Sequence, residues 1–280
     1  MWLWTIIGRN AINMKLISSR ENELIKHIKK LKDKKYRDKN NEYIVEGIKL
    51  VEEAIKEKVN IKKIIKREGF NYLENISKEI IDKIEEQENI YVTAKIFEEL
   101  TDVKTPQGIL AIIEKDRFVE DKIDYNQDII VALDNVQDPG NLGTILRTVD
   151  SIGVNQILVS KGTVDSYNSK VIRSTMGATF RVKIIECEDL EKTLKQIKQH
   201  SFDIVVTSLQ TSNSIYDINY KKKVIVIGNE ANGVEQSIQN LADYKVKIPM
   251  LGKTESLNAS VATGVILYEY VRQKIYQEGR

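Results

Sequence analysis

Residues 129–152 read IIVALDNVQDPGNLGTILRTVDSI, and this stretch indicates the fold class. The β-branched run Ile129–Leu133 is typical of a buried strand, and a turn containing Pro-Gly follows it. Apolar residues then recur at helical spacing over Leu142–Ile152, with Asn141 as a suitable N-cap. A strand, a turn and a helix in this order predict an α/β fold with a parallel sheet.

The same alternation continues towards the C-terminus. Short β-branched runs predict five more strands, at Ile157–Val159, Val182–Ile185, Ile204–Ser208, Val224–Gly228 and Tyr244–Ile248. Two further helices are predicted at Leu190–Gln199 and Asn258–Lys274. Ligands of such sheets bind outside the carboxyl ends of the strands. We therefore expect a site in the loops that follow Leu133, Ile227 and Ile248.

The first part of the chain predicts a smaller α/β unit of its own. Helices are expected at Arg20–Lys34, Gly47–Glu57, Asn71–Glu85 and Ala94–Leu100, and strands at Tyr43–Val45, Ile61–Lys66, Ile90–Val92 and Gly108–Ile113. At about 100–200 residues per domain, a chain of 280 residues has room for two domains. We predict an N-terminal extension (1–17), a first domain (18–113), a charged linker (114–128) and a second domain (129–280).

Composition excludes several kinds of site. A single cysteine, Cys187, cannot form a disulfide framework or a cysteine-rich zinc site, and two histidines make a histidine-based metal centre unfavourable. We expect no metal, a cytoplasmic location, and a buried or inert thiol at Cys187. The apolar run Trp2–Ile7 is too short to span a bilayer and follows no basic segment, and Met14 is an alternative start.

Charge is unevenly distributed although the net charge is only +2. Residues 26–39 (KHIKKLKDKKYRDK) contain eight Lys or Arg against two Asp. This run is either a solvated helix face or a surface for the phosphates of RNA. The residue pair Lys170 and Arg173 lies three apart on one expected helical face and is open to the same two interpretations. The RNA-contact candidates are Lys29, Lys30, Lys34, Lys35, Arg37, Lys170 and Arg173.

Each of the three candidate loops is ambiguous when taken alone. Arg147 lies well off the apolar stripe of its helix and so faces solvent, a partner chain or a ligand. The segment GNEANG (228–233) has neither the spacing of a dinucleotide fingerprint nor that of a Walker loop. The last helix is apolar nearly all round over Val261–Tyr268, which is typical of a helix buried in a core or in a subunit interface.

Taken together and in this order, the three loops resemble the SpoU/TrmH group of the SPOUT superfamily, which are S-adenosylmethionine-dependent RNA ribose 2′-O-methyltransferases. Its first motif, N-x-G-x-x-x-R, matches Asn141, Gly143 and Arg147. Its second, G-x-E-x-x-G, matches Gly228, Glu230 and Gly233. Its third, I-P-M-x-G-…-S-L-N-x-S, matches Ile248, Pro249, Met250, Gly252, Ser256, Leu257, Asn258 and Ser260. Residues 18–113 also resemble the group's small substrate-binding domain, which is related to an RNA-binding ribosomal-protein fold.

The resemblance implies a C-terminal SPOUT domain with a trefoil knot, a homodimer, and S-adenosylmethionine as methyl donor. The implied donor-binding residues are Thr207, Ser208, Gly228, Asn229, Gly233, Ile248, Pro249, Met250, Gly252, Ser256 and Leu257.

The implied catalytic residues are Arg147, Asn141, Glu230, Asn258 and Ser260. A guanidinium stays protonated, so we expect Arg147 to lower the pKa of the 2′-hydroxyl or to clamp a phosphate, reaching the donor bound in the other subunit. Asn141 would orient Arg147 or the ribose, and Glu230 would fix its own loop or anchor Arg147. Asn258 and Ser260 would hold the loop and the RNA backbone.

The expected activity is 2′-O-ribose methylation of RNA, with ribosomal RNA as the favoured substrate. Methylation of tRNA is one alternative, and a catalytically silent RNA-binding homologue is the other.

Overall fold

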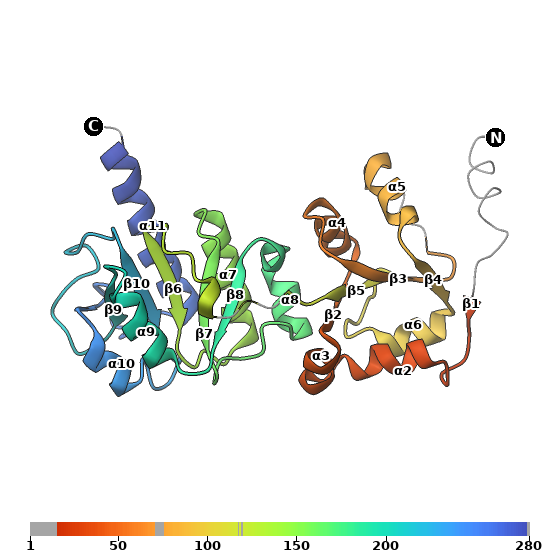
Figure 1. Ribbon diagram of the computed structural model, residues 1–280, viewed down its shortest axis with the longest axis horizontal. Coiled ribbons are helices and arrows are strands. Elements are labelled where there is room, and N and C mark those ends of the chain that lie inside the picture. Colours follow the sequence, from red (N-terminus) through yellow and green to blue (C-terminus); the bar gives the residue numbers. More distant parts are fainter. Residues whose placement is uncertain (1–15, 71–75, 117, 119, 279–280) are drawn as a thin grey trace. The chain divides into compact units, whose positions relative to one another are not determined.

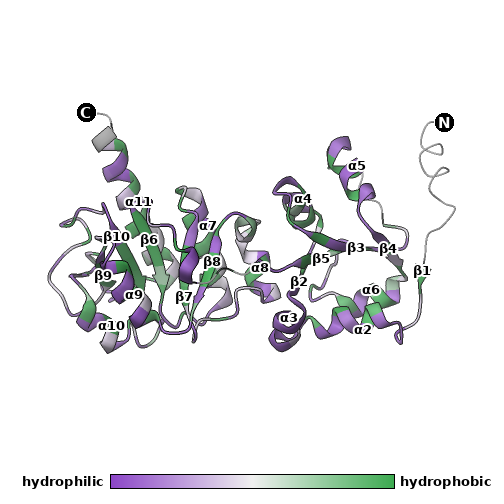
Figure 2. Ribbon diagram, in the orientation of Figure 1, coloured by the Kyte–Doolittle hydropathy of each residue, from purple (hydrophilic) through white to green (hydrophobic). Residues whose placement is uncertain are grey.

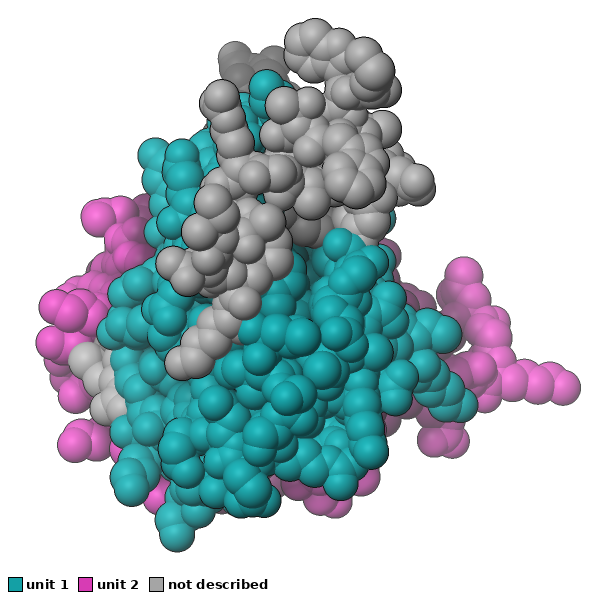
Figure 3. All heavy atoms as spheres, turned by 90° about the vertical axis from the view of Figure 1, so that its right-hand side faces the viewer, with its two compact units in different colours: residues 1–116 teal, residues 117–280 magenta. Residues whose placement is uncertain are grey.

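The computed structural model describes residues 16–70, 76–116, 118 and 120–278. The chain forms two compact units, residues 1–116 (unit 1) and residues 117–280 (unit 2) (Figure 3). Each unit has its own sheet and its own hydrophobic core. The two units are therefore described separately.

Unit 1 contains a five-stranded sheet among its described residues, in the order β1-β4-β3-β5-β2. Strands β1, β4 and β3 run parallel, while β5 runs antiparallel to both β3 and β2. In Figure 1, α4 and α5 lie on one side of this sheet and α2 and α6 on the other. The strands are β1 (Leu16–Ile17), β2 (Glu42–Glu46), β3 (Ile61–Arg67), β4 (Asn89–Val92) and β5 (Ile109–Glu114). The helices are α2 (Glu23–Lys30), α3 (Lys34–Asn40), α4 (Ile48–Lys56), α5 (Lys78–Glu86) and α6 (Ala94–Leu100).

Three predicted elements of unit 1 differ in the structure. The helix expected over Arg20–Lys34 is wrong, because the chain breaks into α2 and α3 where the Asp33 side chain accepts a hydrogen bond from the Lys35 amide and caps α3. Helix α5 begins at Lys78 with Ser77 as N-cap, and residues 71–75 of the expected helix lie outside the described part. Strand β1, in the expected extension, pairs with β4.

Unit 2 contains a six-stranded sheet in its described part, with the order β11-β9-β10-β6-β7-β8. Every neighbouring pair is parallel. The predicted α/β class, with a parallel sheet in the C-terminal part and a small α/β unit before it, is confirmed. The strands are β6 (Ile129–Leu133), β7 (Gln156–Ser160), β8 (Lys183–Cys187), β9 (Asp203–Thr207), β10 (Lys223–Ile227) and β11 (Tyr244–Val246).

Helices cover both faces of this sheet. The central strand β6 alternates between the two cores: Ile129, Val131 and Leu133 contact one core, while Ile130 and Ala132 contact the other. Its apolar character is visible along its length in Figure 2. One core includes residues of α7 (Pro139–Ser151), α8 (Ser169–Thr175) and α11 (Ala259–Glu278), and the other includes residues of α9 (Leu190–Lys198) and α10 (Gln236–Leu241). The implied trefoil knot stays a prediction.

The segment expected to be a linker contributes to folded structure at both ends. Glu114 is the last residue of β5. Ile123, after the short helix η1 (Glu120–Lys122), is buried in the second core of unit 2, and Phe118 forms a bridge to Ile185. The many charged residues of this segment suggested a linker, although Phe118 and Ile123 pack in unit 2.

Cys187 is buried and unpaired, as predicted. Burial raises the pKa of its thiol to about 12, so the nucleophilic thiolate is suppressed. Within the residues that the structure describes, no helix has both the length and the apolar character needed to cross a bilayer.

Candidate active site

The predicted motif loops follow adjacent strands of unit 2. Strands β6, β10, β9 and β11 are neighbours, and their parallel order places their carboxyl ends at one edge of the sheet. The first motif loop follows β6, the second follows β10, and the third follows β11. Parallel sheets bind ligands at this edge because loops from several strands meet there.

The start of α7 differs from the prediction for Asn141. Asp138, not Asn141, is the N-cap, and its carboxylate accepts a hydrogen bond of 2.8 Å from the Asn141 amide. Pro139 occupies the first helical position, where its missing N–H costs nothing. Asn141 therefore lies in the first turn of the helix, buried, with its side-chain amide available for other partners.

Asn141 connects the three motifs through its side chain. Its Nδ2 donates a hydrogen bond of 2.7 Å to Oε1 of Glu230 in the second motif. Its Oδ1 accepts one of 2.9 Å from Nδ2 of Asn258 in the third motif. Asn258 Oδ1 in turn accepts bonds from the backbone N and the Oγ of Ser260, at 2.9 and 2.7 Å, and so caps α11. Four of the five predicted catalytic residues thus form one hydrogen-bonded chain, which we call the motif relay (Glu230, Asn141, Asn258 and Ser260).

Glu230 contacts the first motif loop and not Arg147. Besides Asn141, its carboxylate accepts longer hydrogen bonds from the backbone amides of Gln137 and Asp138, at 3.3 and 3.4 Å. Partial burial acts to raise the pKa of this carboxyl, but the bonds from Asn141 and the backbone amides outweigh it, and the pKa is lowered. The carboxylate is therefore ionised at neutral pH and holds the first loop to the second.

The second motif forms a tight turn that requires its glycines. The backbones of Asn229 and Gly233 exchange hydrogen bonds of 3.0 and 2.9 Å, and Gly233 has φ = 70°. A Cβ atom on Gly228 would overlap with the backbone of Gly233 and Val234. The Asn229 side chain donates to the Asn135 carbonyl, at 2.8 Å, and so ties the turn to the first loop.

Asp134 is a buried carboxylate that the sequence analysis did not select. It is 2% exposed, and its Oδ2 accepts a hydrogen bond of 2.7 Å from the Glu235 amide at the end of the second loop. Its Oδ1 accepts one of 2.9 Å from the Asn135 side chain. The available signal was its position, since an acidic residue directly after a buried strand needs hydrogen-bond donors nearby.

The third loop has unpaired backbone groups, which suit a ligand rich in donors and acceptors. Among the described residues, the N–H and C=O groups of residues 248–257 make no hydrogen bond to other backbone groups. Ile248 packs partly on the core, whereas Pro249, Gly252 and Ser256 are exposed and Leu251 is fully so. The edges of an adenine and the hydroxyls of a ribose could be bound by such a backbone. The residues therefore fit the expected donor.

Thr207 is the last residue of strand β9, and Ser208 follows it. The Thr207 hydroxyl donates a long bond of 3.5 Å to the Val226 carbonyl, and the Ser208 amide donates one of 2.9 Å to the Val246 carbonyl. Both side chains are half-buried at the carboxyl edge. They adjoin the strands that lead into the second and third loops.

Arg147 does not join the motif relay. It is exposed on α7, and within the described part of the chain its guanidinium has no hydrogen-bond or ion-pair partner. Six residues along a helix separate it from Asn141 by about 9 Å and by about 120° around the axis. Its side chain therefore leaves the helix in a different direction from that of Asn141.

Gly143, the glycine of the first motif, lies where α7 packs against α8. A Cβ atom on Gly143 would overlap with Cβ of Ser174, so this glycine permits α7 and α8 to pack closely. On α8, Lys170 is exposed, and Arg173 is half-buried with its Nη1 enclosed and without a hydrogen-bond partner among the described residues.

The basic run of unit 1 is largely neutralised. Lys29 pairs with Glu99 at 2.7 Å and Lys34 with Asp38 at 3.4 Å. Arg37 is wrong as an RNA-contact candidate because it is 5% exposed and its guanidinium donates to backbone carbonyls. Lys30 lies 5.8 Å from the ring of Tyr36, and Lys35 is exposed.

Comparison with known proteins agrees with this geometry. The model of the SpoU rRNA Methylase family matches residues 128–268, which contain all three motif loops and the motif relay. The chain belongs to this family. Residues 22–111 match the MRM3-like substrate binding domain, a range that runs from just before α2 into β5 of unit 1.

Relatives with curated names match most of this SpoU-family chain. It is 31% identical to the 23S rRNA (guanosine(2553)-2′-O)-methyltransferase RlmP of Bacillus subtilis (strain 168), over 91% of this chain and 98% of that protein. The crystal structure of an AdoMet-bound rRNA methyltransferase from Sinorhizobium meliloti is 30% identical, has a TM-score of 0.81, and covers 93% of this chain and 98% of its own. The SpoU methyltransferase AviRb from Streptomyces viridochromogenes shares the fold, at 24% identity and a TM-score of 0.80 over 91% and 99% of the two chains.

Proposed function

We propose that this SpoU-family chain transfers a methyl group from S-adenosylmethionine to a ribose 2′-hydroxyl of ribosomal RNA. The motif relay carries the proposal. It joins three loops from different strands at the ligand-binding edge of the sheet, which is how a site is kept in one geometry before substrate arrives. A cytoplasmic location is part of the same proposal.

The second and third loops would hold the methyl donor. We assign its adenosine and ribose to the unpaired backbone of residues 248–257 and to the turn at Gly228, Asn229 and Gly233, with Thr207 and Ser208 beside them. The donor supplies a methyl group on a positively charged sulfur, which is already electrophilic. The protein's task is then mainly alignment, which is worth on the order of 7–11 kcal/mol.

Arg147 would act on the acceptor. An unpaired guanidinium stabilises a hydroxyl oxygen that is losing its proton, or holds the adjacent phosphate in place, without itself giving up a proton. The motif relay would position loops and does not itself reach the reacting oxygen. Arg147 is therefore the catalytic residue in this scheme, and Asn141, Glu230, Asn258 and Ser260 are positioning residues.

The exposed faces of α7 and α11 support a homodimer. Val261, Tyr268 and Ile275 are spaced seven residues apart on α11, and each is more than half exposed. The Tyr268 hydroxyl lies 3.3 Å from Oγ of Ser151 on α7, so this apolar row adjoins the helix that carries Arg147. We propose that a second copy covers this face and that Arg147 then serves the partner's donor site. The trefoil knot of the C-terminal segment belongs to the same proposal.

The decisive test is methyl transfer from labelled donor to purified RNA. The protein should label rRNA, and the product should be an alkali-resistant dinucleotide, because a 2′-O-methyl group blocks hydrolysis at that ribose. Arg147→Ala is the matched control and should bind the donor in calorimetry without transferring the methyl group. Label in tRNA alone would assign the other substrate, and absence of donor binding would favour a silent RNA-binding homologue.

A further inference from the structure

We propose that unit 1 holds RNA phosphates with one edge of its sheet and not with the basic run of α2 and α3. This edge, which we call the loop edge, consists of residues 47–49, 67–70, 93–95 and 101–108. The inference rests on the proposed function, because it assigns a surface of the substrate-binding domain to the RNA that unit 2 would methylate.

The sheet topology gathers these four segments. Strands β2 and β3 both run antiparallel to β5, and Glu46 and Lys66, near their carboxyl ends, pair with Leu110 and Ile109 near its start. In the parallel pair, Arg67 of β3 stands beside Val92 of β4. The loops after β2, β3 and β4 and the loop before β5 therefore meet at one edge.

Hydrogen bonds connect these loops to one another. The Gly47 amide donates to the Ile109 carbonyl at 3.0 Å, and the Arg67 amide donates to the Gly108 carbonyl at 2.8 Å. The Gln107 side chain accepts a bond of 2.9 Å from the Ile48 amide at the start of α4. The loop edge is thus a connected surface built from four separate stretches of chain.

Its cations are available. Lys49, Arg67, Lys95 and Lys104 each come from a different segment, and within the described residues none of their side chains has an ion-pair or hydrogen-bond partner. Lys49, Lys95 and Lys104 are exposed, and Arg67 is half-exposed. Four such charges on adjoining loops suit contacts to the phosphates of an RNA backbone.

Its acids are already engaged in holding the loops. Glu68 accepts a hydrogen bond of 3.0 Å from the Ala94 amide at the start of α6. Glu46 accepts one from the Thr101 hydroxyl and one of 3.3 Å from the Asp102 amide. Asp102 pairs with Lys32 at 2.8 Å. These hydrogen bonds leave Glu46 and Glu68 charged, but the four cations outnumber them, so the net charge of the loop edge is positive.

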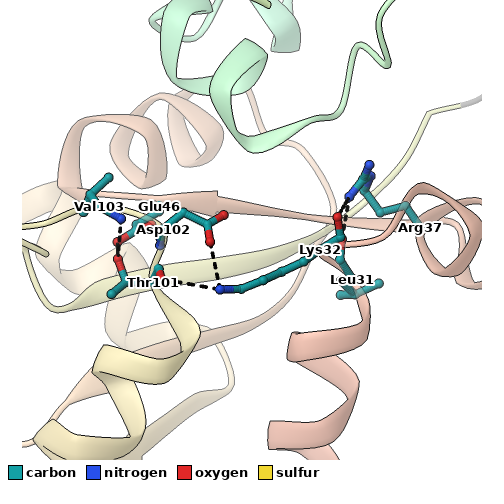
Figure 4. Close-up of polar contacts among 7 residues, drawn as sticks. All are labelled: Leu31, Lys32, Arg37, Glu46, Thr101, Asp102 and Val103. Atoms are coloured by element: carbon teal, nitrogen blue, oxygen red, sulfur yellow. Dashed lines mark hydrogen bonds and ion pairs between the residues drawn. The ribbon is translucent and has the colours of Figure 1, made fainter.

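A polar network fixes the loop that carries Lys104 (Figure 4). The Thr101 hydroxyl oxygen accepts a hydrogen bond of 3.1 Å from the Val103 amide. Lys32 connects this loop to the turn between α2 and α3, where the Arg37 guanidinium donates to the Leu31 and Lys32 carbonyls, both at 2.7 Å. Lys32 and Arg37 of the basic run thus stabilise the loop edge through hydrogen bonds.

The α2–α3 run has little free charge left. Besides the pairs of Lys29 and Lys34, Lys26 pairs with Glu21 at 2.9 Å, Lys32 pairs with Asp102, and Arg37 is buried. Five of its eight cations are therefore neutralised or enclosed. The four cations of the loop edge have no such ion pairs among the described residues, and this contrast decides between the two surfaces.

The test compares three triple substitutions in the full chain, each removing three positive charges. The first variant changes the loop edge (Lys49→Gln, Arg67→Gln, Lys104→Gln). The control changes the opposite edge of the same sheet (Lys58→Gln, Lys62→Gln, Lys63→Gln), and the third changes the basic run (Lys30→Gln, Lys34→Gln, Lys35→Gln). Filter binding of a 23S rRNA transcript is measured at KCl concentrations from about 50 to about 300 mM, over which salt progressively weakens contacts to phosphates. It gives the Kd at each concentration and the slope of log Kd against log[KCl].

The loop-edge variant should bind this transcript about tenfold more weakly or worse, and its log–log salt slope should fall by about two to three, since each lost phosphate contact removes about 0.7–0.9. Its donor affinity and its kcat at saturating RNA should match those of the unchanged chain. An unchanged slope, an equal loss in the control, or a larger loss in the basic-run variant would overturn the proposal. A wild-type protein that binds RNA but never methylates it would refute the proposed function and leave this binding comparison intact.

Discussion

At the scale of single residues, Asn141 has two hydrogen-bonding ends, and each serves a different motif. Its amide nitrogen donates to Glu230 and its amide oxygen accepts from Asn258. Asn141→Asp keeps the size of the side chain but places a second carboxylate against Glu230. We expect donor affinity and kcat both to fall, by about tenfold or more each, because like charges at hydrogen-bond distance repel and a donor is lost.

A second substitution checks the cause of that loss. In the double variant Asn141→Asp with Glu230→Gln, the side chain at position 230 supplies the donor and the side chain at 141 the acceptor. Part of the activity should return, measured as kcat and donor Kd alongside each single variant in a double-mutant cycle. Additive losses would show that Asn141 and Glu230 do not act through their mutual bond.

The lowered pKa of Glu230 predicts a pH dependence of stability. Its folded-state pKa lies below the ordinary value of 4.5, so the carboxylate contributes stability above about pH 4.5 that is lost as the pH falls through the folded-state pKa. The unfolding midpoint in urea, measured between pH 6 and pH 3, should therefore fall more steeply in the unchanged chain than in Glu230→Gln. Parallel curves for the two proteins would contradict this assignment.

At the scale of elements, the contact between α7 and α8 depends on one missing side chain. Gly143→Ala should lower the free energy of unfolding by about 1–3 kcal/mol, because the new methyl group overlaps with Ser174 and closely approaches the Val171 carbonyl. Ser174→Gly in the same chain should recover part of that loss, since it removes the nearest atom. Urea denaturation of the two single variants and the double variant measures both effects, and no recovery would locate the clash elsewhere.

The elements themselves followed from periodicity, while their ends and their mutual contacts did not. The strand at Ile129–Leu133 and the helix at Ala94–Leu100 were predicted with the bounds that the structure has, because each has a clear apolar pattern. The cap of α7 was misplaced by three residues, although Pro139 at the first helical position already indicated Asp138. Asp138 and Asn141 are both good N-cap residues, and local sequence preference cannot choose between them. The choice depends on the Asn141 side chain, which bonds to Glu230 and Asn258 instead.

The hydrogen bonds of the motif relay could not be predicted from the sequence either. Its members are 89 and 117 residues apart in the chain, and nothing local states which side chains meet. The resemblance to the family selected the residues, but their partners came from the strand order. The same limit applied to Arg37, whose charge suggested RNA and whose burial could be seen only once α2 and α3 were known to be separate helices.

At the scale of the whole molecule, the exposed row on α11 predicts self-association. Tyr268 is 54% exposed at the middle of that row. Tyr268→Lys should convert the proposed dimer to a monomer in light scattering at micromolar concentration, because it would bury an unpaired charge at the centre of the proposed apolar interface. Lys274→Glu, on the same helix but outside the row, is the control for a change of charge. A Tyr268→Lys protein that remains dimeric would place the interface on another face.

The proposed dimer also predicts that two inactive chains can form an active pair. Arg147→Ala removes the guanidinium that we propose to be catalytic, and Gly252→Trp places a bulky side chain in the proposed donor loop, where nothing lies within 4 Å of a Cβ. If Arg147 serves the partner's donor site, each mixed dimer has one complete site of two. Refolding the chains together in equal amounts should then restore about a quarter of wild-type methyl transfer, because half of the two-fold dimers are mixed. Donor titration must first show that Arg147→Ala binds and Gly252→Trp does not. Activity that stays at background, while mixed dimers are recovered through two different affinity tags, would mean that Arg147 acts within its own subunit.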